Sequence, residues 1–377
     1  MSDPITAVLE SILHECAAAA PEGALADYIP ELARADRDLF GIVLESHEGD
    51  AYAAGDATAE FTIQSISKPF VYALALEDFG LDAVVARVGA EPSGEPFNAI
   101  SLEAGTGRPA NPMINAGAIL TTALVGGGFE RIAHGLSAFA RRPLEVDEAV
   151  YESEHRTGHR NRAIAHLMRG AGSLPGSVDD VLDIYFRQCS LLVTAGDLAM
   201  MAATLANAGR DPITDEHVVS EATAQHVLSV MAMCGMYDWA GHWMLRVGLP
   251  AKSGVSGGVL AVSPGQFGIG LFSPPLDAAG NSVRGVLACE RLAQRSGLHL
   301  LHDATSGARA AKVLVDGDVI RLRGDIDFAA AELVLRKSRE RGGAPLRLDV
   351  TGVTRMHPVA ERMLAAVTAD PPGHATR

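Results

Sequence analysis

The stretch FTIQSISKPF, residues 61–70, holds two serines and one lysine where a strand-like run gives way to a helix-like run. Side chains three positions apart lie on one face of a helix, whereas adjacent side chains diverge. Lys68 is therefore predicted to pair with Ser65 and not with Ser67. A serine hydroxyl needs a base to become a nucleophile, and a desolvated lysine can be that base. This spacing predicts acyl transfer on Ser65; the alternative interpretation is a helix-capping serine beside a solvated lysine.

Lysine is scarce in this chain: only four of the 31 basic residues are lysines, at positions 68, 252, 312 and 337. Arginine stays protonated, so a lysine in an arginine-rich chain suggests a position where a proton must be released. Lys252 lies in AKSGVSGGV, whose small residues would let a substrate carbonyl approach the backbone. An early Ser-x-x-Lys with a late Lys-Ser-Gly is the pattern of penicillin-recognising acyl-transfer enzymes. Burial and the charge of Lys252 are both expected to lower the pKa of Lys68.

The composition describes a well-buried globular protein, because 48% of the residues are hydrophobic and 20% are charged. The formal net charge of −15 argues against nucleic acid and an anionic membrane surface as partners. The N-terminal stretch has helical apolar spacing and no basic region, and no apolar run could span a bilayer. A cytoplasmic location is predicted. Four cysteines without CxxC spacing are expected to be buried free thiols.

The order of predicted elements indicates how these motifs are positioned. A hairpin is expected over 39–56, a helix over 66–78, and mostly short helices over 116–247. Two apolar β-runs joined by the turn SPGQ follow over 257–275, and a helix over 283–294. Strands at both ends with helices between them imply one sheet assembled from distant parts of the chain. The predicted class is α+β with an inserted helical subdomain.

A long ordered series of motifs spans nearly the first 300 residues. In chain order they are ADYIPELA (26–33), FTIQSISKPF (61–70), NPMINAGAI (111–119), YESEHRTGHRNRA (151–163), YFRQCS (185–190), DLA (197–199), MAMCGMYDWAG (231–241) and GLPAKSGVSGGV (248–259). The series resembles the bacterial serine-dependent glutaminase family, which has a β-lactamase/transpeptidase-like fold. The resemblance implies hydrolysis of L-glutamine to L-glutamate and ammonia through an acyl-enzyme. It implies no cofactor and no metal, and a homo-oligomer, either dimer or tetramer.

Carried over motif by motif, the resemblance makes Ser65 the nucleophile and Lys68 its base, with Tyr237 and Lys252 as further catalytic residues. The substrate-binding residues that it implies are Ser65, Asn115, Glu154, Asn161, Tyr185, Tyr237 and Val255. Backbone N–H groups of Ser65 and Val255 would form the oxyanion hole.

Each residue type suits its implied role. A buried carboxylate such as Glu154 matches an ammonium, and asparagine amides can donate to a carboxylate. Glu154 and Asn161 lie two helical turns apart, although Gly158 between them could interrupt the helix. The alternative for each residue is ordinary: an Asn cap, a surface Glu or a core Tyr. Which tyrosine relays protons stays open.

The sequence also allows three functions other than glutamine hydrolysis. A zinc site is conceivable because His155 and His159 lie four apart with Glu154 and His166 nearby, but no further ligand spacing supports it. A β-lactamase or D-alanyl peptidase is disfavoured because no export signal and no Ser-Asp-Asn between the lysine motifs is found. A catalytically dead scaffold is disfavoured by the intact set of Ser65, Lys68 and Lys252.

The sequence pattern changes after the predicted catalytic domain, residues 1–302. A linker is expected over 303–311, a small α/β unit over 312–369 and a frayed tail over 370–377. Two segments of this unit resemble a STAS domain (anti-sigma-factor antagonist) that stops before its last strand and helix. They are VIRLRGDIDFAAAE (319–332) and LRLDVTGVTRMHPVA (346–360). Where active members carry a phosphorylated hydroxyl, this chain has His-Pro-Val-Ala (357–360), so phosphorylation there is not expected. The alternative is an appendage for stability or dimer contacts.

Overall fold

The computed structural model describes residues 3–20, 22–93, 96–301, 311–316, 319–342 and 347–367. These residues form two compact units, one within Leu13–Cys289 and one built from the described residues on either side of that segment. Residues 303–310 of the predicted linker and the predicted tail, 370–377, lie outside the described residues. The predicted domain boundaries stay a prediction.

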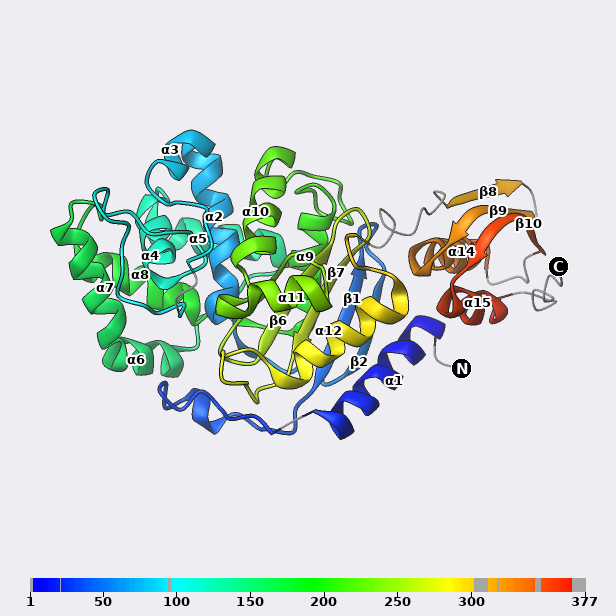
Figure 1. Ribbon diagram of the computed structural model, residues 1–377, viewed down its shortest axis with the longest axis horizontal. Coiled ribbons are helices and arrows are strands. Elements are labelled where there is room, and N and C mark those ends of the chain that lie inside the picture. Colours follow the sequence, from blue (N-terminus) through cyan, green and yellow to red (C-terminus); the bar gives the residue numbers. More distant parts are fainter. Residues whose placement is uncertain are drawn as a thin grey trace. The chain divides into compact units, whose positions relative to one another are not determined.

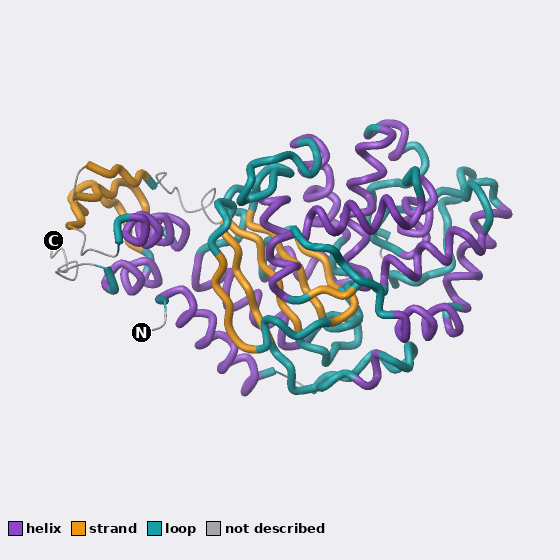
Figure 2. Tube along the Cα trace, turned by 180° about the vertical axis from the view of Figure 1, so that it is seen from behind, coloured by secondary structure: helices purple, strands orange, loops and turns teal. Residues whose placement is uncertain are grey.

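The larger unit contains a five-stranded antiparallel sheet in the order β2-β1-β7-β6-β5 (Figure 2). Its strands are β1 (Gly41–Ser46), β2 (Ala51–Gly55), β5 (Ala251–Ser253), β6 (Gly258–Ser263) and β7 (Phe267–Phe272). β1, β6 and β7 are buried along their whole length, so both faces of the sheet are covered there. The prediction of one sheet assembled from distant parts of the chain is confirmed.

One face of this sheet is covered at very close range by helix α9 (Ala195–Ala206). Two glycines of β7 make the approach possible: a Cβ atom at Gly270 would lie 2.0 Å from the Ala195 carbonyl oxygen, and one at Gly268 would lie 2.2 Å from that of Ala199. Helix α12 (Val283–Ser296) also packs on the sheet, less tightly: a Cβ atom at Gly285 would lie 3.1 Å from Cγ2 of Val259 in β6. The predicted α+β class, a sheet flanked by helices, is confirmed; the likeness to the β-lactamase/transpeptidase fold stays a prediction.

Helix α2 (Ser67–Phe79) is the central helix of the larger unit and is buried on nearly all sides, as expected for a helix that is apolar all round. In Figure 1 the helices α4 to α8 gather on one side of α2, and the sheet lies on the other. The surrounding helices are α3 (Leu81–Val85), α4 (Asn115–Leu124), α5 (Gly128–Ala140), α6 (Glu148–Thr157), α7 (His159–Gly170), α8 (Val178–Cys189), α10 (Glu221–Cys234) and α11 (Ala240–Arg246). The chain enters α2 from a short strand, β3 (Phe61–Thr62), which pairs with β4 (Leu192–Val193). The predicted helix over 66–78 is thus confirmed within one residue.

The described part of the smaller unit contains a three-stranded sheet, ordered β10-β9-β8. Its elements are β8 (Lys312–Asp316), β9 (Val319–Ile326), α14 (Phe328–Glu340), β10 (Arg347–Met356) and α15 (Pro358–Ala365). β9 and β10 are parallel with α14 between them, which is a βαβ connection, while β8 runs antiparallel to β9. The described part of this unit therefore contains both strands and helices, and its assignment to the STAS family stays a prediction.

The N-terminal segment forms the expected helix, α1 (Pro4–Ala19). None of the described helices is long and apolar enough to cross a membrane. All four cysteines are buried free thiols, as predicted.

Candidate active site

Ser65 lies on a one-turn 3-10 helix, Gln64–Ile66, directly before α2. Its neighbour Gln64 has a φ of 49°, a left-handed conformation that is uncommon for a residue with a side chain. The fully buried Ser67 hydroxyl donates a 2.8 Å hydrogen bond to the Gln64 carbonyl, and Gln188 Nε2 donates to Ser67 Oγ at 3.4 Å. Ser67 therefore stabilises the turn that presents Ser65, which is 7% exposed.

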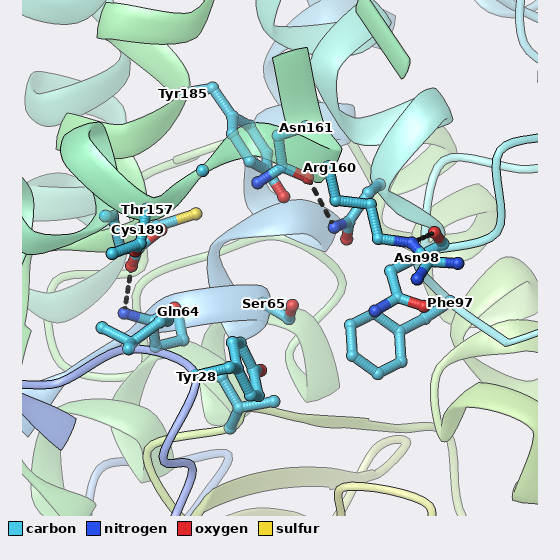
Figure 3. Close-up of a pocket in the computed structure, with 15 residues that line it drawn as sticks. Tyr28, Gln64, Ser65, Phe97, Asn98, Thr157, Arg160, Asn161, Tyr185 and Cys189 are labelled. Atoms are coloured by element: carbon cyan, nitrogen blue, oxygen red, sulfur yellow. Dashed lines mark hydrogen bonds between the residues drawn. The ribbon is translucent and has the colours of Figure 1, made fainter. Parts of the chain in front are cut away.

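Ser65 opens into a cavity of about 390 Å³ (Figure 3). Six of the predicted site residues line it: Ser65, Asn115, Glu154, Asn161, Tyr185 and Val255. The other three predicted residues, Lys68, Tyr237 and Lys252, lie behind the cavity wall and are buried. The fold thus gathers residues from β5–β6, α2, α4, α6, α7 and α8 around Ser65.

Lys68 is fully enclosed in the first turn of α2. Its Nζ donates a 2.7 Å hydrogen bond to Asn115 Oδ1 and a 3.3 Å bond to the Met113 carbonyl. Burial lowers the pKa of the Lys68 amine to about 8, although Cys189 and Glu154 act in the opposite direction. About a tenth of the amine is therefore neutral at pH 7, far more than for an exposed lysine.

The Tyr237 hydroxyl donates a 2.9 Å hydrogen bond to the Ser253 carbonyl. Burial raises the pKa of Tyr237, and the neighbouring Ser65 hydroxyl acts in the opposite direction. Lys252 Nζ donates to the same carbonyl at 2.7 Å and lies 4.0 Å from the centre of the Tyr237 ring. Burial, and secondarily the charge of Lys68, lowers the pKa of Lys252 well below its usual value. The Ser65 hydroxyl thus lies beside Tyr237, while Lys68 donates to Asn115 and to the Met113 carbonyl.

Glu154 is a buried carboxylate on α6 that accepts a 2.6 Å hydrogen bond from Gln64 Nε2. Burial raises the pKa of Glu154 to about 7, opposed by the bond from Gln64 and by the charge of Lys68. An anion that sits in such a site without a full counter-charge is well suited to receive a cation.

Gly158 interrupts the helical stretch between α6 and α7, so Glu154 and Asn161 do not share one helix. A Cβ atom at position 158 would lie 2.5 Å from Cζ of Phe186, which explains the glycine. Both residues nevertheless line the same cavity, and Asn115 Nδ2 donates a 2.8 Å hydrogen bond to Asn161 Oδ1.

Several cavity residues were missed by sequence reasoning, notably Tyr28, Gln64, Phe97 and Cys189. Tyr28 belongs to the ADYIPELA motif, which was the one available indication of its role. The Phe97 ring packs against the Tyr237 ring with ring centroids 4.4 Å apart, a tertiary contact that no local sequence pattern predicts. In the parts of the chain that the structure describes, no group of three or more His, Cys, Asp or Glu side chains could hold a metal ion, so the zinc alternative gains no support.

Comparison with known proteins gives one consistent result. The family model "Glutaminase" matches residues 23–301. A glutaminase of Trichormus variabilis is 52% identical over 302 residues, which cover 79% of this chain and 90% of that protein. Among solved structures, Mglu superposes with a TM-score of 0.77 at 44% identity, covering 97% of this chain and 95% of that one. A probable glutaminase from Bacillus subtilis, complexed with 6-diazo-5-oxo-L-norleucine, gives a TM-score of 0.73 at 32% identity and covers 80% of this chain and 98% of that one.

Proposed function

Because the chain belongs to the glutaminase family, we propose that it hydrolyses L-glutamine to L-glutamate and ammonia through an acyl-enzyme on Ser65. The observation that supports the mechanism is a fully buried lysine, three positions after the Ser65 of the cavity wall, whose pKa is lowered to about 8. Such a lysine can accept a proton at neutral pH, and a serine needs this help to attack an amide.

The hydrogen bonds of Lys68 fit the role of general base. A neutral amine has two N–H bonds and one lone pair, and Lys68 donates to two acceptors, Asn115 Oδ1 and the Met113 carbonyl. These two bonds use both N–H groups of the neutral amine, so its lone pair is left to take the proton of Ser65. Tyr237, whose hydroxyl lies beside Ser65 Oγ, would relay this proton and protonate the departing ammonia.

The oxyanion of the tetrahedral intermediate would be held by the backbone N–H groups of Ser65 and Val255. Val255 lies in the turn between β5 and β6, which is closed by bonds from Gly257 N to Gly254 O and from Gly254 N to Gly258 O. Within the described residues no acceptor takes the Val255 N–H, so it is available to a ligand oxygen in the cavity that Val255 lines.

The amino-acid part of the substrate would bind at the far end of the cavity. Glu154 supplies a carboxylate for the α-ammonium, while Asn161 and Tyr185 supply donors for the α-carboxylate. Breakdown of the acyl-enzyme by water then releases L-glutamate and restores Ser65.

Glu154→Gln should raise the KM for L-glutamine by roughly 30-fold or more, the scale expected when a buried charge pair loses one partner. Glutamine keeps the size and the hydrogen-bonding capacity of the side chain, so the change is confined to charge. Steady-state kinetics of purified protein would measure it, with Glu152→Gln on the exposed face of α6 as the matched control. An unchanged KM would remove Glu154 from the ammonium site.

The pH dependence of catalysis should follow Lys68 and Glu154, the two groups of the proposed mechanism whose pKa values are shifted toward neutral pH. The base Lys68 is protonated below its pKa of about 8, so kcat should rise with pH, by about tenfold per unit well below that value, and level off above it. Glu154 is protonated below its pKa of about 7, so KM should fall as pH rises through 7. A kcat that does not change between pH 6 and 9, or that falls over this range, would contradict Lys68 as the base.

The experiment that tests the function is ammonia release from L-glutamine by the purified protein, with L-asparagine and a chromogenic cephalosporin as comparison substrates. Ammonia and glutamate formed in equal amounts from glutamine support the proposal. Covalent labelling of Ser65 by 6-diazo-5-oxo-L-norleucine, located by peptide mass spectrometry, would support the acyl-enzyme. Rapid cephalosporin hydrolysis without ammonia release would instead favour a β-lactamase, and no turnover with failed labelling would favour a catalytically dead scaffold.

A further inference from the structure

Strand β8 (Lys312–Asp316) lies at one edge of the three-stranded sheet of the smaller unit. Figure 1 shows it beside β9, on the side away from β10. Among the strands that the structure describes, β9 is the one that pairs with β8, so the other side of β8 is open to a further strand. The N–H and C=O groups along such an edge are a template on which another chain can pair.

The two edges of this sheet differ in regularity. The pairing of β10 with β9 shifts register twice, between Asp349 and Gly352 and between Val353 and Arg355. Irregularities of this kind bend a strand, and they are one way in which proteins protect a sheet edge from pairing. β8 instead pairs with β9 in unbroken register over its whole length. Of the two edges, β8 is therefore the one suited to accept another strand.

The middle of β8 is apolar and its ends are charged. Leu314 is 47% exposed and Val315 is 48% exposed, although they point to opposite faces of the sheet. Lys312 begins the strand and Asp316 ends it. A charge in the middle of an edge strand discourages pairing, but β8 carries its charges at the ends. Its apolar centre is therefore a surface that a second strand could cover.

The sequence of β8, KVLVD, is self-complementary in an antiparallel pair. Two copies of β8 related by a twofold axis at Leu314 would place Lys312 opposite Asp316 of the second copy. Val313 would lie opposite Val315 of that copy, and the two Leu314 side chains would face each other. Opposite charges and apolar pairs directly across from each other are the contacts that stabilise neighbouring strands. Every position of β8 thus finds a matching partner in a second β8.

This register is favoured over its neighbours. Residues directly opposite each other in a strand pair point to the same face, so a twofold pair can shift its register only in steps of two residues. Such a shift would place Lys312 opposite Leu314 and leave three paired positions where the twofold axis at Leu314 gives five. It would also separate both charge pairs. The sequence therefore selects one arrangement.

Both faces of the joined strands would find partners. Val313 and Val315 lie opposite Leu322 and Ile320 of β9, which are buried on the side of the sheet that α14 covers. Pairing would continue this apolar layer from one copy into the next. On the other face, Asp316 Oδ2 lies 2.8 Å from Arg321 Nη1, and the Asp316 side chain is still 63% exposed. Its carboxylate can therefore contact a second cation.

We propose that β8 is the interface through which two copies of this chain form a twofold-symmetric dimer. The two three-stranded sheets join there into one continuous six-stranded sheet. A five-residue edge buries less surface than a standard stable interface, so the dimer depends on protein concentration. The proposal is independent of the proposed catalytic reaction, and ammonia release is not a measure of it.

The first test reverses the charges at the two ends of β8 in the full chain. Lys312→Asp and Asp316→Lys each place like charges opposite each other twice, so each should weaken self-association by about tenfold or more. An equimolar mixture of the two variants restores opposite charges at both positions and should associate about as tightly as the wild type. Sedimentation velocity over a range of concentrations measures the association. Lys337→Asp, the same charge change on α14, is the matched control and should leave it unchanged.

The second test traps the contact covalently. The four native cysteines are buried, so Leu314→Cys adds an exposed thiol. Residues directly opposite each other in an antiparallel pair have Cα atoms about 4.5–5.5 Å apart, a separation that a disulfide can span. Mild oxidation should therefore give a dimer linked through position 314, identified by peptide mass spectrometry. Leu245→Cys, at a more exposed leucine on α11, is the control and should give little linked dimer.

Three results would overturn the β8 interface. The first is a wild type that stays monomeric up to about 1 mM. The second is an association that resists both charge reversals, or a mixture of the two variants that associates no better than either alone. The third is a Leu314→Cys protein that forms no more linked dimer than Leu245→Cys. Recovery in the mixture together with a link at position 314 would support the proposal, because a change in folding alone produces neither.

Discussion

Ser65→Ala should abolish ammonia release from L-glutamine, with kcat lowered by about 10⁴-fold or more, as when the nucleophile of a serine hydrolase is removed. Its hydroxyl lies in the wall of the cavity beside the Tyr237 hydroxyl, so it is the atom placed to form the covalent bond. The same substitution should prevent covalent labelling by 6-diazo-5-oxo-L-norleucine. A coupled glutamate assay and intact-protein mass spectrometry would measure the two effects.

Ser67→Ala is the matched control two positions away. Its hydroxyl donates to the Gln64 carbonyl, so its loss weakens the left-handed turn and should cost about 1 kcal/mol of unfolding free energy. Activity should persist, with a kcat within about tenfold of the wild type, since a hydrogen bond of that size changes a rate by no more. An inactive Ser67→Ala beside an active Ser65→Ala would reverse the assignment of the nucleophile.

Lys68→Arg should lower kcat by about 10³-fold, within the range attributed to a positioned general base. Arginine keeps the positive charge but cannot release its proton at accessible pH. Because the site is fully buried and arginine is the larger side chain, Lys68→Met provides a second variant of similar length that removes the base without adding volume. Both variants should lose the rise of kcat with pH through about 8.

The control for the two Lys68 variants is Lys337→Arg on the partly exposed face of α14, where Lys337 forms a surface ion pair with Glu340. It should leave kcat and the thermal midpoint unchanged. Circular dichroism and thermal unfolding would establish that the Lys68 variants are folded. A folded Lys68→Met protein with near-normal kcat would transfer the base role to another group, and Tyr237 is the candidate whose hydroxyl lies beside Ser65.

The elements of the fold could be predicted because each carries a local pattern. The apolar run LFGIVLES and the turn HEGD predict the β1–β2 hairpin, and SPGQ predicts the turn between β6 and β7. The joining of these hairpins in one sheet followed from the helical stretch between them. The close contact of α9 with Gly268 and Gly270 could not be predicted, because a glycine in a strand has several possible reasons.

The sequence predicted many of the residues that make up the candidate site, but not which of them contact one another. The spacing predicts that Lys68 pairs with Ser65, whereas the hydrogen bonds of Lys68 in the structure go to two oxygen acceptors in the segment 113–115. The Tyr237 hydroxyl lies beside Ser65. The left-handed φ of Gln64 could not be foreseen, since glutamine has no preference for that region and only the surrounding bonds enforce it. Catalytic roles of individual residues, the STAS-like unit and the homo-oligomer stay predictions.

The side chain of Gln64 has a consequence for substrate length. This residue precedes the nucleophile in the chain, and its amide nitrogen also holds the Glu154 carboxylate at 2.6 Å. One short side chain therefore sets the separation between the atom that would attack the amide and the atom that would bind the α-ammonium. Asparagine is shorter than glutamine by one methylene, so we expect it to engage only one of these two groups at a time. A misplacement of about 1 Å can cost about 10²-fold in rate, so this spacing should make the proposed enzyme prefer glutamine by chain length.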